Sequence, residues 1–370
     1  MIRDSVRTGA YTEALRRAVE PGAVVLDIGA GTGIFSLLAC RYGASRVYAI
    51  EPSDVIEVAR RIAAANGCAD RITFIQDFST RIELPERADV LIQDINGILP
   101  LFERSLPSII DARERLMKPD GILIPREEML WATLVQTPEL YEECVGECPE
   151  KPYGIDMSAT RPMATNSFYK ARFESKQLLT EPQCCARLDF AQAKDSGVHN
   201  KISWTMDRSG TAHGLGFWFD SILAPGICIS NAPGCPKLIY GNTFFPFSEP
   251  VRLERGDVVH ADLRADLVGD DYIWSWNTRV EADGRVKANF KQSTFYGAPL
   301  SLSKLKKQAA DFRPKRNEEG EIKAAALNLM DGGHALEEIA RELLKRFPRR
   351  FASVEEALAR AGDFSKEYSL

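Results

Sequence analysis

The sequence predicts an α/β protein in which a doubly wound parallel sheet precedes an antiparallel β domain and a small helical region. Two observations lead to this prediction. In residues 1–135, apolar runs of strand length alternate with helical patterns, which is typical of a parallel sheet. From about residue 167, apolar side chains recur at every second position, which is typical of half-buried antiparallel strands.

Five apolar runs are the candidate strands of the first domain: 24–28, 47–50, 72–75, 88–93 and 121–124. Helical patterns lie between them, including Ile34 to Tyr42, 54–66 and 103–117. Pro119-Asp120-Gly121 predicts a turn that opens the last strand. The order of these segments is that of alternating strands and helices.

The β domain is predicted over 167–300, after a polar and partly helical stretch at 136–166. Its clearest alternation lies at 258–265 and 272–280. One face of the second segment gathers apolar and aromatic side chains, namely Tyr272, Trp274, Trp276, Thr278 and Val280. We interpret the two tryptophans as core residues, with a ligand platform as the alternative.

The C-terminal part divides into a basic linker, 301–320, and a helical region, 321–370. Apolar residues recur at helical spacing at Leu336, Ile339, Ala340, Leu343, Leu344 and Phe347. Ser353 followed by Glu356 predicts a capping box at the start of a final helix.

Composition narrows the class of partner. The net charge of −5 argues against nucleic-acid binding driven by overall charge. No apolar run approaches the roughly 18 residues of a membrane span, and the N-terminus has no apolar signal region. We therefore expect a cytoplasmic protein without a membrane or nucleic-acid partner. The eight cysteines form no C-x-x-C pair, so reduced thiols and no metal site are predicted.

A glycine-rich turn follows the first apolar run and predicts a nucleoside site. Asp27 is followed by Gly29, Gly31 and Gly33, and the helical pattern then begins at Ile34. Glycines at such a turn let the backbone approach a ligand without side-chain clash. A dinucleotide fingerprint would need glycine at position 34, so this spacing favours a different nucleoside.

Glu51 ends the second apolar run, at the same edge of the sheet as the glycine turn. Its carboxylate can accept two hydrogen bonds from ribose hydroxyls.

Two further acids flank the loop after the fourth apolar run. Asp94 opens this loop, Gly97 lies inside it and Glu103 closes it. Two carboxylates converging in one cleft suit a cationic acceptor with several N–H donors, such as a guanidinium.

These motifs resemble known families. The pattern D-x-G-x-G-x-G resembles the class I S-adenosylmethionine methyltransferases. The loop 93–103 is similar to the acceptor loop of the protein arginine methyltransferases, S-E-W-M-G-Y-x-L-x-x-E, with Asp94 and Glu103 at its two glutamates and Gly97 at its glycine.

The resemblance extends over roughly residues 2–298. Asp4 to Thr8 looks like the family's D-x-V-R-T, whose arginine, here Arg7, meets the cofactor carboxylate. Residues 111–121 follow its A-R-D-x-x-L-x-P-D-G, and Tyr153 to Ser158 resembles its Y-G-F-D-M-S at the dimerisation arm.

The resemblance implies a Rossmann-like methyltransferase domain (1–135), a helical dimerisation arm (136–166) and a β-barrel substrate domain (167–300). It implies a homodimer that uses S-adenosyl-L-methionine to methylate a guanidino group in a peptide, a protein or a small molecule. The cofactor would be held by Arg7, Asp27, Gly29, Gly31, Gly33, Glu51, Asp77 and Ser79. Asp94 and Glu103 are the predicted catalytic residues, and Gly97 and Tyr240 the predicted substrate pocket.

The chain departs from the family pattern at two places. The first acid of the loop is Asp94, one carbon shorter than glutamate. Leu238-Ile239-Tyr240 replaces the family's Thr-His-Trp, so its histidine is absent and Tyr240 keeps only an aromatic wall. Two alternatives therefore stay open: a small-molecule O- or N-methyltransferase, and a catalytically idle, cofactor-binding partner that binds a peptide.

The C-terminal region resembles the small winged-helix peptide-binding domains of the PqqD type at Ala326 to Gly332, Leu336 to Ala340 and Phe347. The alternative is a helical cap packed on the β domain.

Overall fold

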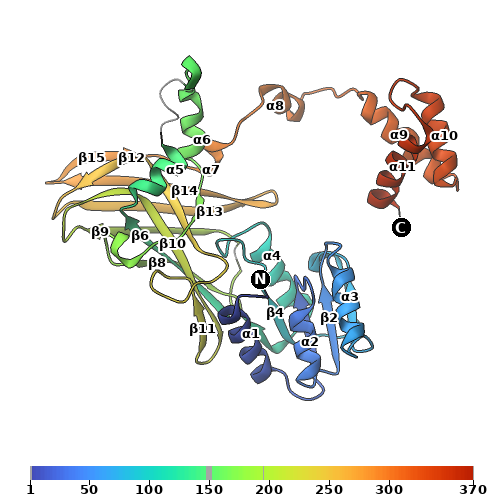
Figure 1. Ribbon diagram of the computed structural model, residues 1–370, viewed down its shortest axis with the longest axis horizontal. Helices are drawn as coiled ribbons and strands as arrows, with labels where there is room; N and C mark the ends of the chain where they lie inside the picture. Colours follow the sequence, from blue (N-terminus) through green and yellow to red (C-terminus); the bar gives the residue numbers. More distant parts are fainter. Residues whose placement is uncertain (1, 147–151, 195, 370) are drawn as a thin grey trace. The chain divides into compact units, whose positions relative to one another are not determined.

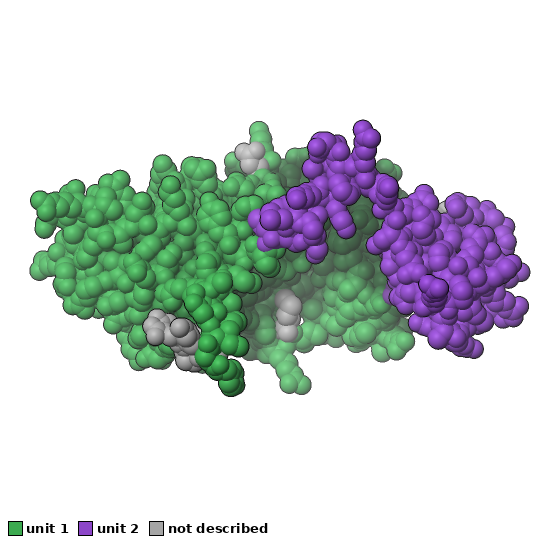
Figure 2. All heavy atoms as spheres, turned by 90° about the horizontal axis from the view of Figure 1, so that it is seen from above, with its two compact units in different colours: residues 1–299 green, residues 300–370 purple. Residues whose placement is uncertain are grey.

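The computed structural model describes residues 2–146, 152–194 and 196–369. The chain forms two compact units, Met1–Pro299 and Leu300–Leu370, which Figure 2 colours separately. Each unit is described by itself.

A parallel sheet of five strands forms the first part of unit 1. Its strands are β1 (Val24–Ile28), β2 (Arg46–Ile50), β3 (Ile72–Ile75), β4 (Ala88–Gln93) and β5 (Met117–Ile124). They lie in the order β3-β2-β1-β4-β5, and every neighbouring pair is parallel. The chain thus runs outward from β1 to β3 and resumes beside β1 at β4. This topological switch point between β1 and β4 is where open α/β sheets bind ligands.

Helices connect these strands, as the sequence predicts (Figure 1). The predicted helices are α2 (Ile34–Arg41), α3 (Ile56–Ala65) and α4 (Ser105–Arg115). The short 3₁₀ turn η1 (Ser79–Arg81) between β3 and β4, and helix α1 (Ser5–Ala18), which precedes β1, were not predicted. The expected turn at Pro119-Asp120-Gly121 is instead an irregularity inside β5. Met117 pairs with Ala88 and Ile122 with Val90, so the extra residues bulge out of the ladder, where proline cannot donate a hydrogen bond.

Two antiparallel sheets form the rest of unit 1. The larger contains β6 (Glu127–Val135), β7 (Tyr169–Ala171), β8 (Gln183–Asp189), β10 (Gly210–Ala224) and β12 (Asn242–Leu253) in the order β7-β12-β10-β6-β8, with β11 (Ile227–Ser230) paired to β10. The smaller contains β9 (Val198–Thr205), β13 (Val258–Val268), β14 (Asp271–Ala282) and β15 (Arg285–Phe290) in the order β15-β14-β13-β9. These sheets confirm the predicted fold class.

Aromatic side chains fill the space between the two antiparallel sheets. The Phe245 ring on β12 lies 5.5 Å from the Trp274 ring and 5.0 Å from the Trp276 ring on β14. Both tryptophans are buried, and Trp276 Nε1 donates to the Pro246 carbonyl at 3.1 Å. Trp276 is therefore a core residue as interpreted, whereas Trp274, although buried, also lines a cavity, so the alternative of a ligand platform stays open for it.

The antiparallel part of unit 1 begins at residue 127, before the boundary at residue 135 that the sequence predicts for the first domain. Strand β6, Glu127–Val135, lies within the segment assigned to the first domain, but pairs antiparallel with β8 and β10. Seven of its nine residues are buried, so both faces are covered and the period-two pattern that marks the later strands is missing.

Helical segments link and flank the antiparallel strands. Between β6 and β7 lie α5 (Pro138–Val145), the turns η2 (Pro152–Gly154) and η3 (Ser158–Thr160), and α6 (Arg161–Thr165). The expected helical arm at 136–166 thus has helices over its described part, while 147–151 lie outside the described residues. The turn η4 (Ser175–Gln177) precedes β8, and α7 (Thr294–Gly297) follows β15.

Unit 2 consists of α8 (Leu302–Gln308), α9 (Glu318–Met330), α10 (Leu336–Arg346) and α11 (Val354–Tyr368). The last three enclose their own core, which includes Ile322, Ala326, Ile339, Leu343 and Phe364. Ser353 Oγ accepts a hydrogen bond from the Glu356 amide at the start of α11, which is the first half of the predicted capping box. The Glu356 carboxylate accepts the Ala352 amide at 2.7 Å in place of the Ser353 amide. No strand occurs among residues 300–369, so the likeness to winged-helix domains extends to helices alone.

Among the described helices of both units, none is long and apolar enough to cross a membrane.

Candidate active site

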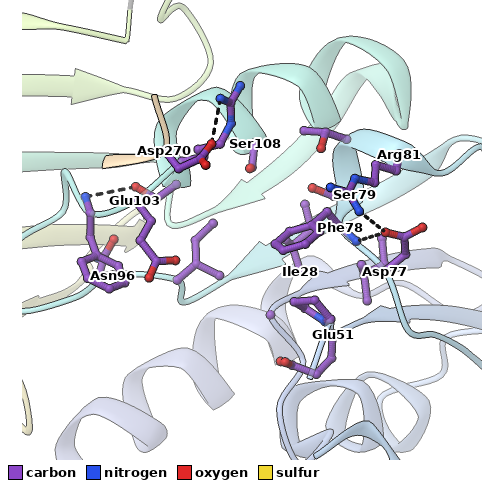
Figure 3. A pocket seen from close by; sticks show the side chains of 18 of the residues that line it. Ile28, Glu51, Asp77, Phe78, Ser79, Arg81, Asn96, Glu103, Ser108 and Asp270 are labelled. Atoms are coloured by element: carbon purple, nitrogen blue, oxygen red, sulfur yellow. Dashed lines mark hydrogen bonds and ion pairs between the residues drawn. The ribbon is translucent and has the colours of Figure 1, made fainter. Parts of the chain in front are cut away.

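A cavity of about 900 Å³ opens at the carboxyl ends of the parallel strands (Figure 3). Its walls come from the ends of β1 and β2 and from the loops after β3 and β4, including Gly29, Glu51, Asp77 and Asn96. This strand-end cavity therefore lies at the switch point between β1 and β4. Its volume is within the range of small-molecule and cofactor sites.

The glycine turn shapes the floor of the strand-end cavity. Gly29, Gly31 and Gly33 have φ values of 72°, 52° and 77°, which side chains rarely adopt. A Cβ on Gly29 would lie 2.5 Å from Ile95 Cγ2, so only glycine lets the turn approach the loop after β4. Gly29 lines the cavity, whereas Gly31 and Gly33 support the turn behind it.

Glu51 is held in one orientation at the cavity wall. Its Oε2 accepts the Gly31 amide at 3.0 Å, and its Oε1 accepts the Ser53 amide at 3.0 Å and the Ser53 hydroxyl at 2.6 Å. A carboxylate offers about four lone-pair sites, so capacity for about one further donor, such as a ribose hydroxyl, remains.

Asp27, a predicted cofactor residue, is not among the residues that line the strand-end cavity. It is 1% exposed beneath the glycine turn, where the Ser36 hydroxyl of α2 donates to its Oδ2 at 2.6 Å. Burial raises the pKa of Asp27 to about 6. The serine in the first turn of α2 thus engages this carboxylate, which joins the turn to the helix.

Asp77 and Ser79 both line the strand-end cavity, after β3. The Asp77 Oδ1 accepts the Phe78 amide at 2.7 Å, and the Ser79 carbonyl accepts Arg115 Nη2 at 3.0 Å. Between them, Phe78 is 52% exposed on the cavity wall, with the Arg81 guanidinium 5.0 Å from its ring centre. This aromatic face could have been found from its place directly after Asp77, and it offers a stacking surface for a base.

A second cavity of about 650 Å³ adjoins the first and is mostly aromatic and apolar. Gly97 and Tyr240, the predicted substrate-pocket residues, both line this aromatic cavity, with Phe168 and Trp274. A Cβ on Gly97 would lie 2.7 Å from the Phe102 ring, so glycine there allows the ring to pack against the loop.

Three residues, Asn96, Phe102 and Asp271, line both cavities. Two of them belong to the loop 93–103, which we call the acceptor loop. The third opens strand β14, a part of the chain that sequence reasoning did not connect with the site. These residues form the shared wall.

Glu103 lies at the strand-end cavity, beside the shared wall. It has a φ of 45°, and its amide donates to Asp271 Oδ1 at 3.2 Å. Next to it, Arg104 Nη1 donates to the Gly269 carbonyl at 3.2 Å. The hairpin between β13 and β14 therefore holds the end of the acceptor loop.

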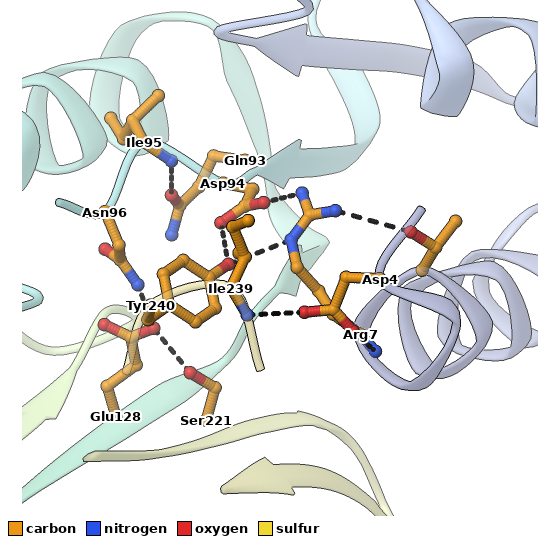
Figure 4. Close-up of polar contacts among 11 residues, drawn as sticks. Asp4, Arg7, Gln93, Asp94, Ile95, Asn96, Glu128, Ser221, Ile239 and Tyr240 are labelled. Carbon is orange, nitrogen blue, oxygen red and sulfur yellow. Dashed lines mark hydrogen bonds and ion pairs between the residues drawn. The ribbon is translucent and has the colours of Figure 1, made fainter. Parts of the chain in front are cut away.

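Asp94 lines neither cavity. It forms an ion pair with Arg7, in which both side chains are 4% exposed, and accepts the Tyr240 hydroxyl at 2.5 Å (Figure 4). Arg7 Nε in turn donates to the Tyr240 hydroxyl at 2.9 Å. The expected convergence of Asp94 and Glu103 in one cleft is therefore corrected, because the buried guanidinium on α1 takes the first carboxylate. The catalytic roles of both acids stay predictions.

Sequence reasoning missed one further acid at the site. Glu128 on β6 is fully buried, and its Oε1 accepts Asn96 Nδ2 and Ser221 Oγ, each at 2.6 Å. Burial raises the pKa of Glu128 to about 7. Only the fold brings this strand against the acceptor loop, so no local pattern in the sequence could identify it.

Two family models match the chain. Residues 8–134 match the family described as ribosomal protein L11 methyltransferase (PrmA). Residues 128–279 match the family described as the arginine methyltransferase oligomerization subdomain. The second match begins inside β6, in agreement with the structural boundary.

Two curated relatives illustrate the similarity. The chain is 31% identical over 266 residues to an arginine N(omega)-methyltransferase of Streptomyces achromogenes subsp. streptozoticus, covering 70% of this chain and 73% of that protein. It is 34% identical over 230 residues to a probable protein arginine N-methyltransferase 6 of Arabidopsis thaliana, covering 60% of this chain and 52% of that protein. The chain thus spans about half the length of this Arabidopsis relative.

Solved structures have the same fold. The PRMT1 enzyme–prozyme heterotetrameric complex of Trypanosoma brucei with AdoHcy matches with a TM-score of 0.72 at 24% identity, covering 79% of this chain and 95% of that one. Protein arginine methyltransferase 10 of Arabidopsis thaliana, described in a uniquely open conformation, matches with a TM-score of 0.67 at 25% identity over the same shares.

Proposed function

Since this chain belongs to the arginine methyltransferase family, we propose that it transfers a methyl group from S-adenosyl-L-methionine to a nitrogen of a guanidino group. The observation that carries the proposal is the shared wall of Asn96, Phe102 and Asp271. A donor in the strand-end cavity and an acceptor in the aromatic cavity would meet at this wall. Positioning of two reactants in this way lowers a barrier by several kcal/mol.

The strand-end cavity fits the cofactor. Gly29 lines the cavity without a side chain, Glu51 can accept one further hydrogen bond from a ribose hydroxyl, and Phe78 exposes a ring for the adenine. Asp77 and Ser79 complete the wall on the same side. When bound, the cofactor supplies an electrophilic methyl carbon on a sulfonium, which a nucleophile must approach in line with the carbon–sulfur bond.

The acids would serve the acceptor. A guanidinium is a poor nucleophile because its lone pair is delocalised and its pKa exceeds 12. Glu103, which lines the strand-end cavity beside the shared wall, would hold the guanidinium and offset the positive charge that it would gain as the nitrogen–carbon bond forms and the carbon–sulfur bond breaks. The methylated nitrogen then loses a proton, for which a carboxylate is a suitable acceptor. Asp94 would act on this site through Tyr240, which it binds and which lines the aromatic cavity.

The acceptor is arginine in a peptide or protein, or a small guanidine. The relatives described above include an arginine N(omega)-methyltransferase and a probable protein arginine N-methyltransferase. The aromatic cavity can pack the aliphatic part of such a side chain against Tyr240, Phe168 and Trp274. A small-molecule O- or N-methyltransferase and an idle cofactor-binding protein remain the alternatives to be tested.

A homodimer is part of the proposal. It is supported by the match to an oligomerization subdomain and by exposed apolar side chains in the arm 136–166. These are Tyr153, Ile155, Met157 and Met163. The cytoplasmic location expected from the sequence stays a prediction.

The decisive experiment offers isotope-labelled cofactor with free arginine, an arginine-containing peptide and a neutral hydroxyl compound in separate reactions. Label transfer to either arginine acceptor, with methylarginine in the hydrolysed product, supports the proposal and tells peptide from small molecule. Transfer to the hydroxyl compound alone contradicts it and favours the first alternative. Cofactor binding without any transfer favours the second.

A further inference from the structure

The acceptor loop has no regular structure between Asp94 and Arg104, so no backbone ladder fixes its position. Its position depends on side-chain contacts. At its start, Asp94 bonds Tyr240 and Arg7. In its middle, Asn96 Nδ2 donates to Glu128 Oε1 at 2.6 Å, and the Ile98 carbonyl accepts the longer hydrogen bond of Thr243 Oγ1 at 3.3 Å.

The anchor for Asn96 is rigid. Glu128 on β6 and Ser221 on β10 face each other as register partners across the antiparallel ladder, and the Ser221 hydroxyl donates to Glu128 Oε1 at 2.6 Å. We call Asn96, Glu128 and Ser221 the loop clamp (Figure 4). Asn96 lies 32 positions from Glu128 in the chain, and Ser221 lies 93 positions from it, so the clamp joins segments that only the fold brings together.

The burial of the Glu128 carboxyl in this position lowers the stability of the fold. Glu128 is 0% exposed, it has two neutral donors on one oxygen, and its Oε2 has no hydrogen-bond partner among the described residues. The guanidinium of Arg7 is already paired with Asp94. An apolar residue would fill a strand interior at lower cost, since a buried carboxylate without a cation loses several kcal/mol of hydration. Glu128 lines neither cavity itself, but it bonds Asn96, which lines both, so it is a candidate for function.

Asn96 also belongs to the shared wall, and methyl transfer between the two cavities would take place beside it. We propose that Glu128 is a positioning residue for methyl transfer, which holds Asn96 and thereby fixes the wall common to the two cavities. The catalytic part of this inference rests on the proposed function. Its structural part, that Glu128 holds Asn96 in place, does not depend on that function.

The charge of Glu128 sets the strength of the clamp. Hydrogen bonds to an ionised carboxylate are roughly twice as strong as those to a neutral group. Because burial raises the pKa of Glu128 to about 7, the carboxyl gains its charge as the pH rises through neutrality. The charge of Glu128 acts on Tyr11 of α1 and on Tyr240 before β12, and the charge of Arg7 acts on the same two tyrosines in the opposite direction. Burial first, and then the charge of Glu128, raises the pKa of Tyr11, which stays protonated throughout this range.

The test compares Asn96→Ala, Glu128→Ala and Glu128→Gln with the wild type, and uses Glu127→Gln as the matched control. Glu127 precedes Glu128 on the same strand, but pairs with the exposed Arg187 at 2.6 Å and takes no part in the clamp. The first readout is amide hydrogen exchange over residues 94–99 in the free protein, which requires no acceptor. The second is kcat and KM, with the cofactor Kd, from pH 6 to pH 9.

Asn96→Ala and Glu128→Ala should raise loop exchange at least fivefold and lower kcat at least tenfold, with the cofactor Kd within threefold of wild type. Glu128→Gln keeps an acceptor oxygen but carries no charge, so it should restore loop protection only in part, and it should lose the rise of kcat near pH 7 that the wild type shows. The control should match the wild type in every readout. If Glu128→Ala fails to fold, Ser221→Ala and Glu128→Gln carry the same comparison.

Unchanged loop exchange in Asn96→Ala and Glu128→Ala overturns the clamp. A kcat rise near pH 7 that persists in Glu128→Gln overturns the role of its charge. If exchange changes as expected but the wild type methylates no guanidino acceptor, the clamp stands and the proposed function fails.

Discussion

Arg7 and Asp94 form an ion pair in which each side chain is only 4% exposed. The pair joins α1 to the start of the acceptor loop, and Tyr240 bonds both partners. A buried charge that loses its partner is far more costly than a surface charge that does so. The pair therefore links the stability of the fold to the position of the site.

Asp94→Asn should destabilise the protein by about 3–5 kcal/mol, because it leaves the Arg7 charge buried without a counter-charge. Denaturant unfolding followed by tryptophan fluorescence measures this in unit 1 alone, since all five tryptophans lie before residue 300. Glu13→Gln, which breaks an exposed pair on the same helix α1, is the control and should have little effect. If Asp94→Asn lowers the free energy of unfolding no more than the control does, the ion pair between Arg7 and Asp94 does not form in solution.

Glu51→Ala should lower the affinity for S-adenosyl-L-methionine at least about tenfold. A hydrogen bond to a charged group contributes about 1.5–3 kcal/mol, and about 1.4 kcal/mol is a tenfold change. Titration calorimetry measures the affinity. Glu57→Ala, an exposed glutamate on the neighbouring helix α3, should bind as the wild type does. Equal affinities in both variants would remove Glu51 from the cofactor site.

The local motifs of the first domain could be predicted because each depends on neighbours in sequence. Strand β1, the turn after Asp27 and the acid Glu51 follow one another along the chain, and the structure places Gly29 and Glu51 at one cavity. The alternation on β13 and β14 was equally readable, because one face of each strand is covered and the other is more open.

Contacts between residues far apart in the chain could not be predicted from the sequence. Nothing near Asp94 indicates that Arg7, 87 positions earlier in the numbering, takes its charge. Likewise Glu128 lies on a strand covered on both faces, where alternation is lost, and its partners Asn96 and Ser221 come from distant segments. Residues of the site that meet only in the fold carry no local signal.

Asp27→Asn should make the stability of unit 1 less sensitive to pH between about 4 and 6. Burial raises the pKa of Asp27 from 3.8 to about 6, so the folded state holds a proton that the unfolded state has already lost. Stability from this group is therefore present below pH 4 and falls as the pH rises to 6, by roughly 3 kcal/mol. Unfolding curves at pH 4, 5, 6 and 7 should show the variant gaining on the wild type over this range. A constant difference between the two would mean that Asp27 is charged in the folded protein at all these pH values.

Ile155→Glu should convert the proposed dimer to a monomer, because it puts a charge on the exposed apolar part of the arm. Sedimentation at micromolar concentration should give a wild-type species of about twice the 41.2 kDa chain mass and a variant of one chain mass. Val286→Glu, at an equally exposed apolar position on β15, is the control and should stay dimeric. A wild-type species of one chain mass would exclude the dimer.

Glu103→Gln tests the guanidino acceptor most directly. The change keeps the shape of the side chain and the hydrogen bond from the backbone amide of residue 103 to Asp271 Oδ1. It removes the negative charge beside the shared wall. Removal of one preorganised electrostatic group costs about two orders of magnitude or more in turnover, so kcat for an arginine acceptor should fall by that much. Cofactor affinity should stay nearly constant, because Glu51 and the glycine turn are intact. Glu114→Gln, at an exposed position near the end of α4, serves as the control and should retain full turnover. Near-normal turnover of Glu103→Gln with a neutral hydroxyl acceptor would favour the small-molecule alternative, since a neutral nucleophile does not need this charge.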